Sequence, residues 1–221
     1  MKKSVYGKTT EYAYDATNQL VSSSCDGKET KYAYDAAGRM IKEGERSYAY
    51  GWLDKVMSVA ENDKETAKFE YHNSGQIARA VRESNVETFE WDGLALIERS
   101  GTKYVNEPHA GGGNPVVSDS EVFFNDMLGS TLGAVNGKEY SAVDKTAFGV
   151  SNSGTNTFFT GKPYIADLGY AFLFRNYRAD VGKWQTQDPL GYPDGWNNFA
   201  YCGNSVIAAI DLNGLSAGGS L

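Results

Sequence analysis

The ten residues YAYDAAGRMI, from Tyr32 to Ile41, contain the pattern that decides the fold. Two tyrosines separated by one residue have the period of a β-strand with one buried face. Asp35 and Gly38 then stand at the first and last positions of a four-residue turn, and an apolar pair begins a return strand. The stretch therefore predicts a β-hairpin with a glycine bulge.

The same pattern recurs along the first hundred residues, as YAYD at 12–15, YAYG at 48–51, FEYH at 69–72 and FEWD at 89–92. The second aromatics of the five units are 20, 16, 21 and 20 residues apart: Tyr14, Tyr34, Tyr50, Tyr71 and Trp91. The first unit is degenerate, with Asn18 in place of the glycine, and the third is shortened. Because one hairpin cannot bury its own aromatics, we expect successive hairpins to join into a continuous twisted antiparallel sheet.

A second informative stretch runs from Arg175 to Leu215. It contains that arginine, Asp188 in a DPLG turn, and Asp211 in a DLNG turn. In such turns the carboxylate caps local backbone and the glycine takes a positive φ. Two carboxylates beside a cation are also the minimum set for acid–base cleavage of an amide, because proximity pushes their pKa values apart. The alternative is that both aspartates are turn caps, which the arginine neutralises.

Composition excludes several function classes. The 221 residues suffice for one sizeable domain, and 15 Tyr with 25 Gly suit a β-rich globular protein. A net charge of −7 opposes phosphate backbones and predicts no nucleic-acid partner. The longest apolar runs, 170–174 and 206–210, are too short to insert into a membrane, and the N-terminus does not resemble a secretory signal.

Nothing in the sequence predicts a metal or a cofactor. His72 and His109 are the two histidines, and Cys25 and Cys202 form no CxxC pair. The glycine-rich segment GGGNP at 111–115 predicts a flexible loop, and it lacks the lysine and helix of a phosphate cradle.

Two further segments lie close in sequence to these turns. The spacing of Phe172, Phe174 and Tyr177 favours a strand that leads to the site. Residues 205–210 fit either a helical turn or a short strand, since six residues do not define a period.

These motifs resemble Rhs (rearrangement-hotspot) repeat proteins, whose relatives include the C subunits of bacterial Tc toxins and the shells of teneurins. The aromatic units are similar to YD repeats, and the second half is similar to the Rhs repeat-associated core domain. The motifs that match the core domain are DMLGS at 126–130, FTGK at 159–162, Arg175 with Tyr177, DPLG at 188–191 and DLNGL at 211–215. Lys183 replaces an arginine of the family pattern, Leu212 replaces a proline, and one extra residue separates the two turns.

The resemblance implies an all-β fold in which stacked antiparallel YD-repeat hairpins form part of a spiral β-shell with a C-terminal core-domain plug. It divides the chain into hairpins at 5–100, a core domain at 101–215 and a short tail at 216–221.

The resemblance also implies an activity. The core domain would act once, as an aspartyl self-cleaving protease with Arg175, Asp188 and Asp211 as its catalytic group. It would cut between Leu215 and Ser216 and release whatever polypeptide follows. An N-to-O acyl shift through the Ser216 hydroxyl is the alternative chemistry. The alternative function is a purely structural or interaction role as a shell fragment with a vestigial site.

The partners that the resemblance implies are upstream shell repeats and a C-terminal cargo polypeptide. An open sheet edge near the N-terminus also favours self-association. Without a signal or a membrane span, export from the cytoplasm would require a larger assembly.

Overall fold

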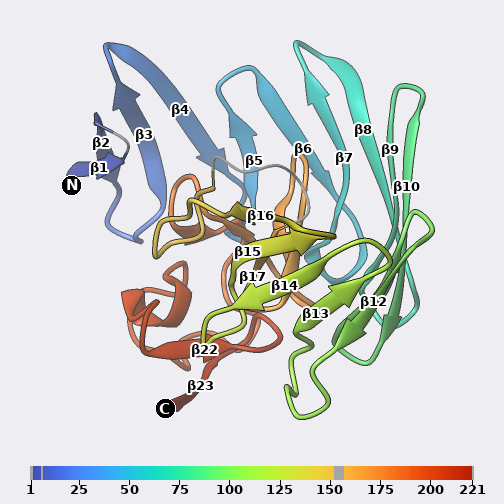
Figure 1. The fold of residues 1–221 in the computed structure, drawn as a ribbon. Helices are drawn as coiled ribbons and strands as arrows, with labels where there is room; N and C mark the ends of the chain where they lie inside the picture. The colour runs from blue at the N-terminus through green and yellow to red at the C-terminus, as the bar shows by residue number, and fades with distance from the viewer. Residues whose placement is uncertain (1, 6, 152–156, 221) are drawn as a thin grey trace.

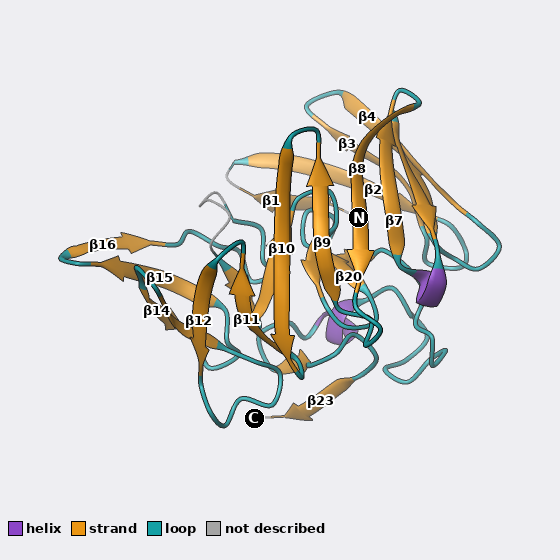
Figure 2. Cartoon of the chain, turned by 90° about the vertical axis from the view of Figure 1, so that its right-hand side faces the viewer, coloured by secondary structure: helices purple, strands orange, loops and turns teal. Residues whose placement is uncertain are grey.

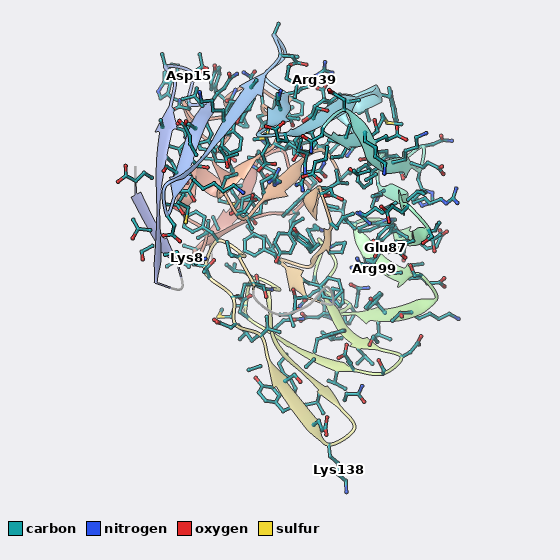
Figure 3. All side chains as sticks on the ribbon, turned by 90° about the horizontal axis from the view of Figure 1, so that it is seen from above. Lys8, Asp15, Arg39, Glu87, Arg99 and Lys138 are labelled. Atoms are coloured by element: carbon teal, nitrogen blue, oxygen red, sulfur yellow. The ribbon has the colours of Figure 1, made fainter. Side chains whose placement is uncertain are left out.

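The computed structural model describes residues 2–5, 7–151 and 157–220, nearly all of them in antiparallel strands and turns. Sixteen strands, β1 to β16, form one sheet in chain order. Seen from above, this sheet curls around central strands that come from the last third of the chain (Figure 3). We call the sixteen-stranded sheet the wall and residues 157–220 the central module. The predicted all-β fold of stacked hairpins is confirmed.

The wall consists of β1 (Lys2–Val5), β2 (Lys8–Tyr14), β3 (Leu20–Cys25), β4 (Lys28–Tyr34), β5 (Met40–Glu43), β6 (Arg46–Tyr50), β7 (Val56–Glu61), β8 (Lys64–Tyr71), β9 (Ile77–Arg82), β10 (Asn85–Asp92), β11 (Ala95–Arg99), β12 (Thr102–Asn106), β13 (Pro115–Ser118), β14 (Val122–Asn125), β15 (Thr131–Asn136) and β16 (Glu139–Ala142). The central module contains β17 (Phe158–Phe159), β18 (Lys162–Ile165), β19 (Gly169–Ala171), β20 (Asn176–Arg178), β21 (Lys183–Trp184), β22 (Ala209–Asp211) and β23 (Ala217–Ser220). Figure 1 labels many of these strands. Two short 3₁₀ turns, η1 (Trp52–Asp54) and η2 (Tyr201–Asn204), are the helical segments of the described residues (Figure 2).

Each YD unit ends a wall strand and bends it. The five aromatic pairs lie on β2, β4, β6, β8 and β10, as the repeat predicts. In every one of these strands the pairing register shifts immediately before the second aromatic, for example between Ala33 and Tyr34. A bulge increases the local twist of a strand. Five bulges at equivalent places therefore add curvature of one sense and help the wall to curl.

The turn after each aromatic pair is built as the sequence predicts. Asp35 Oδ1 accepts hydrogen bonds from the backbone N–H groups of Ala37 and Arg39, both at 3.0 Å. Gly38 completes the turn with a φ of +70°. In the degenerate first unit Asn18 adopts the same left-handed conformation, with a φ of +65°. Asparagine is one of the few residues that tolerate this conformation, so the turn survives without its glycine.

The aromatic face of the wall packs against the central module. Phe69 and Phe89 of the wall are buried in one cluster with Phe158, Ile165 and Leu168 of the module. A second cluster lies within the module and is mostly aromatic: Phe159, Tyr170, Phe172, Tyr177, Trp184 and Tyr201. The module thus supplies the other side of this core.

Three local predictions need correction or completion. The glycine-rich loop at 111–115 is packed rather than free, because Gly112, Gly113 and Asn114 are buried. The predicted strand over 172–177 is interrupted: β19 ends at Ala171 and β20 begins at Asn176, with a bend between them. Residues 205–210 combine both options, a turn closed by hydrogen bonds to the Ser205 carbonyl and then the start of β22 at Ala209.

Replacing Gly161 with alanine is expected to destabilise the fold severely. Gly161 has a φ of +75°, and an added Cβ would lie 1.8 Å from the carbonyl oxygen of Gly113 in the glycine-rich loop. We expect a loss of about 3 kcal/mol, from backbone strain and the clash together. Gly137 is the matched control, since its φ is +60° but nothing lies within 4 Å. Gly137→Ala should lose only about 1 kcal/mol in urea unfolding. Equal losses would show that the contact between loop and module does not matter for stability.

Candidate functional site

Arg175 lies in the bend between β19 and β20 and is 3% exposed. Its guanidinium stacks over the ring of Trp184, with 4.2 Å from Cζ to the ring centroid. Nε donates to the Gly214 carbonyl at 2.6 Å, and one terminal nitrogen donates to the Asn198 carbonyl at 3.1 Å. The other terminal nitrogen is 2.6 Å from Asp188 Oδ2 and 3.5 Å from Asp211 Oδ2. The structure therefore brings the three predicted site residues together.

Asp188 follows β21 and opens the DPLG turn. Its Oδ1 accepts the backbone N–H of Leu190 at 2.8 Å, and Gly191 has a φ of +87°. Its Oδ2 binds Arg175. Burial raises the pKa of this carboxyl, and the arginine opposes that rise.

Asp211 ends β22 and opens the DLNG turn. Its Oδ1 accepts three backbone N–H groups, from Asn213, Gly214 and Leu215 at 3.1, 2.7 and 3.2 Å. Its Oδ2 is buried and has no hydrogen-bond partner among the described residues. Burial raises the pKa of this carboxyl too, and the turn N–H groups and Arg175 oppose the rise.

Asp188 and Asp211 differ from Asp35, a turn cap of the wall, in what their second carboxylate oxygen contacts. At Asp35 that oxygen binds the partly exposed Arg39 of the same turn, at 2.6 Å. At Asp188 and Asp211 it faces the shared, buried Arg175. Arg175, Asp188 and Asp211 alone carry a net charge of −1 unless one carboxyl is protonated; the buried amine of Lys162 also interacts with the charge of Asp211. A single proton held by the pair removes that charge, and the raised pKa values of both groups favour this state.

The predicted scissile bond lies in a hairpin loop. β22 and β23 pair with Asp211 opposite Ala217, so residues 212–216 connect them. Leu215 and Ser216 are half-buried. Within this loop, the carbonyl that Arg175 holds belongs to Gly214, one residue before the predicted scissile carbonyl.

Two neighbours of Asp211 escaped the sequence analysis. The Tyr201 hydroxyl accepts the backbone N–H of Asp211 at 3.3 Å. Lys162, 1% exposed, donates to the Gly112 carbonyl, and burial lowers the pKa of its amine to about 8. Lys162 belongs to the FTGK motif, but its spacing gives no sign that it approaches the site.

Of the three departures from the family pattern, the one at Leu212 has a structural explanation. An added Cβ on Gly112 would lie 2.7 Å from a methyl group of Leu212, so the glycine makes room for the leucine that replaces proline. Lys183 lies away from the site, where its ammonium is 4.6 Å from the centroid of the Tyr14 ring in the wall.

Two other predictions concern metal sites and membrane-spanning helices. Across the described ranges, no group of three or more His, Cys, Asp or Glu side chains is arranged to hold a metal. Neither of the described helical turns is long and apolar enough to cross a membrane.

Comparison with known proteins identifies relatives of this fold. The RHS Repeat family model matches residues 14–49, which include the second YD unit. Toxin subunit YenC1 of Yersinia entomophaga is 27% identical over 211 residues, covering 77% of this chain. A Tc holotoxin pore of Photorhabdus luminescens superposes with a TM-score of 0.66 at 15% identity over 97% of this chain. The TcdB2–TccC3 complex without its hypervariable C-terminal region gives 0.68 at 15% identity over 94%.

These matches confirm the resemblance to Rhs repeat proteins and the likeness of the fold to Tc toxin shells. The chain spans only a part of its relatives, 22% of YenC1 and 13% of each of the two matched chains of known structure.

Proposed function

We propose that this chain forms a section of an encapsulating β-shell and that its central module cuts the chain once, between Leu215 and Ser216. The observation that supports the cut is the buried group of Arg175, Asp188 and Asp211, in which Asp211 Oδ2 has no hydrogen-bond partner among the described residues. A buried polar atom without a partner is costly in a fold that needs only turn caps. A catalytic role, in which Asp211 Oδ2 forms a hydrogen bond with a carbonyl group or a water, would explain why this oxygen has no partner among the described residues.

The chemistry that fits this geometry is hydrolysis by two carboxyl groups. Asp188, kept ionised by Arg175, accepts a proton from a water whose oxygen bonds to the Leu215 carbonyl carbon. Asp211, protonated on Oδ2, donates a hydrogen bond to the carbonyl oxygen and stabilises the developing oxyanion. The C–N bond then breaks, and the Ser216 nitrogen takes the proton that Asp188 received. The products are a carboxylic acid on Leu215 and an amine on Ser216, and transfer of the acid proton to the amine gives a carboxylate and an ammonium group.

In this mechanism Arg175 holds the loop in place instead of binding the oxyanion. Its nitrogens are already engaged by the Gly214 carbonyl, the Asn198 carbonyl and Asp188. It therefore fixes the upstream side of the scissile bond against the carboxylate that acts as base.

The proposed partners follow from the sheet. β1 and β16 are the outermost strands of the wall, and each is paired on one side only among the described strands. Upstream repeats, or a second copy of the chain, would extend the wall at β1. A polypeptide that follows Leu215 would be the cargo. The division into hairpins at 5–100, a core domain at 101–215 and a tail at 216–221 belongs to this proposal.

A structural role without cleavage is the competing function, and one observation favours it. Asp188 and Asp211 open the same Asp-x-x-Gly turn that Asp35 forms in the wall, where the carboxylate serves only turn and arginine contacts.

Intact-mass spectrometry of the purified chain separates the two functions. The chain is incubated for days at neutral and at mildly acidic pH. A product that ends at Leu215, together with the peptide SAGGSL, supports the cut. A product ending at Gly214 would move the cut to the carbonyl that Arg175 holds. A chain that keeps the mass of all 221 residues throughout would leave only the structural role.

Replacing Arg175 with lysine is expected to slow the cut by about 10–100-fold without abolishing it. Lysine keeps the positive charge near Asp188 but cannot also reach the carbonyls of Gly214 and Asn198 with fixed geometry. Small positioning errors cost rate in this range. The rate is read from the fraction of chain cut against time, and circular dichroism checks the fold. A rate equal to that of wild type would exclude the arginine from positioning the loop.

A further inference from the structure

The chain downstream of the proposed scissile bond is held by a third carboxylate. Asp194 Oδ2 accepts the backbone N–H of Ala217 at 2.8 Å. Ala217 is the first residue of β23 and the second residue after Leu215. On the upstream side, Arg175 holds the Gly214 carbonyl and Asp211 holds the Leu215 N–H. Fixed contacts therefore bracket the Leu215–Ser216 bond on both sides.

We infer that Asp194 is a positioning residue for the cut, which fixes the leaving side of the chain against Asp188. The inference rests on the proposed function. Its basis is the placement of both groups in one short loop. Asp188 opens the DPLG turn, and Asp194 follows it by six residues in YPDG. The same loop thus presents one carboxylate to Arg175 and another to the segment that leaves.

The charge of Asp194 also acts on the site. Arg175 and Asp194 are charged groups that act on Asp188. Arg175 also faces Asp211, which interacts in turn with Lys162, Tyr201 and Cys202. Among these, Asp194 is a negative charge that helps to raise the pKa of Asp188. Removing the charge lowers that pKa, so the limb of the pH–rate profile that Asp188 controls moves to lower pH. The direction is the same whether Asp188 acts as acid or as base.

Two substitutions separate the contact from the charge. Asp194→Asn keeps an oxygen that can accept the Ala217 N–H but removes the charge, and Asp194→Ala removes both. The side chain is exposed, so neither change threatens the fold. Asp63→Asn is the control, because Asp63 is exposed in the turn between β7 and β8.

The experiment measures cut fraction against time from pH 5 to pH 8 and hydrogen exchange of the Ala217 amide. We expect Asp194→Ala to cut about 10-fold more slowly, the rate equivalent of one lost hydrogen bond, and to exchange faster at Ala217. Asp194→Asn should keep the amide protection and much of the rate, with its profile moved to lower pH. Asp63→Asn should match wild type in cut rate, in pH profile and in exchange of the Ala217 amide.

Three results would overturn the inference. If both Asp194 variants match wild type in rate and profile, Asp194 does not position the chain. If Asp194→Ala leaves Ala217 exchange unchanged, the hydrogen bond does not hold β23. If wild type itself never cuts while Ala217 exchange does respond to Asp194→Ala, the contact is structural and the failure lies with the proposed function.

Discussion

Replacing Asp211 with asparagine is expected to stop the proposed cut after Leu215 while leaving the fold intact. The asparagine oxygen can accept the same three backbone N–H groups of the turn. At Oδ2, which accepts no hydrogen bond from the described residues, the change removes only the 3.5 Å ion pair with Arg175. An amide cannot hold and exchange the proton that the proposed mechanism requires. General acid–base catalysis contributes about 10²–10⁴-fold, so we expect the rate to fall by about 10³-fold or more. Intact mass over days at mildly acidic and neutral pH measures it.

Asp188→Asn should have a similar effect on the cut and a different effect on stability. It breaks the 2.6 Å ion pair with the buried Arg175, and leaving a buried charge without its partner costs about 3–5 kcal/mol. Asp35→Asn is the matched control, because it alters the same kind of turn in the wall. That variant should cut like wild type.

Continued cutting in the asparagine variants would contradict the aspartyl mechanism. If Asp211→Asn cuts as fast as wild type, the acyl shift through the Ser216 hydroxyl becomes the better explanation. Ser216→Ala would then abolish the cut, whereas the aspartyl mechanism predicts little change.

Replacing Arg178 with alanine is expected to destabilise the fold strongly, because this side chain joins the module to the wall. Arg178, on β20, is 7% exposed. It binds both oxygens of Glu43 on β5, at 3.0 and 2.9 Å, and both oxygens of Asp180, at 3.0 and 2.7 Å. It also donates to the Tyr48 hydroxyl at 3.0 Å. Alanine leaves the largely buried Glu43 without its cation, so we expect a loss of about 3–5 kcal/mol.

Arg79→Ala is the control for this effect. Arg79 forms an exposed ion pair with Glu70 at 3.4 Å, and such pairs contribute only about 0.2–1 kcal/mol. Urea unfolding of the two variants gives the comparison. Similar losses at both positions would mean that the module is anchored by its apolar contacts alone.

The features that the sequence predicted well are local ones. The hairpins follow from aromatics two residues apart and from an aspartate that caps its own turn, as at Tyr34 and Asp35. Both signals lie within about ten residues, so a periodic pattern suffices to find them. Even the degenerate turn at Asn18 could be anticipated, since asparagine tolerates a positive φ.

The features that the sequence missed join distant parts of the chain. Arg178 meets Glu43 across 135 residues, and Lys162 meets Gly112 across 50. No periodicity connects such pairs. For that reason the glycine-rich loop was predicted to be flexible, although the module covers it. The meeting of Arg175, Asp188 and Asp211 was expected from the family resemblance. Two features could be found only from coordinates: Asp211 Oδ2 accepts no hydrogen bond from the described residues, and Asp194 contacts Ala217.

The pairing of β22 with β23 means that cleavage of the chain and dissociation of the downstream polypeptide would be two separate events. The proposed scissile bond lies in the loop between these strands, and the pairs Asp211–Ala217 and Ile210–Gly218 lie outside it. Severing the loop would break the covalent tether and leave a strand that is still docked. The rate at which the downstream polypeptide dissociates would then depend on how fast β23 separates from β22. The hairpin would thus act as a delay between scission and escape.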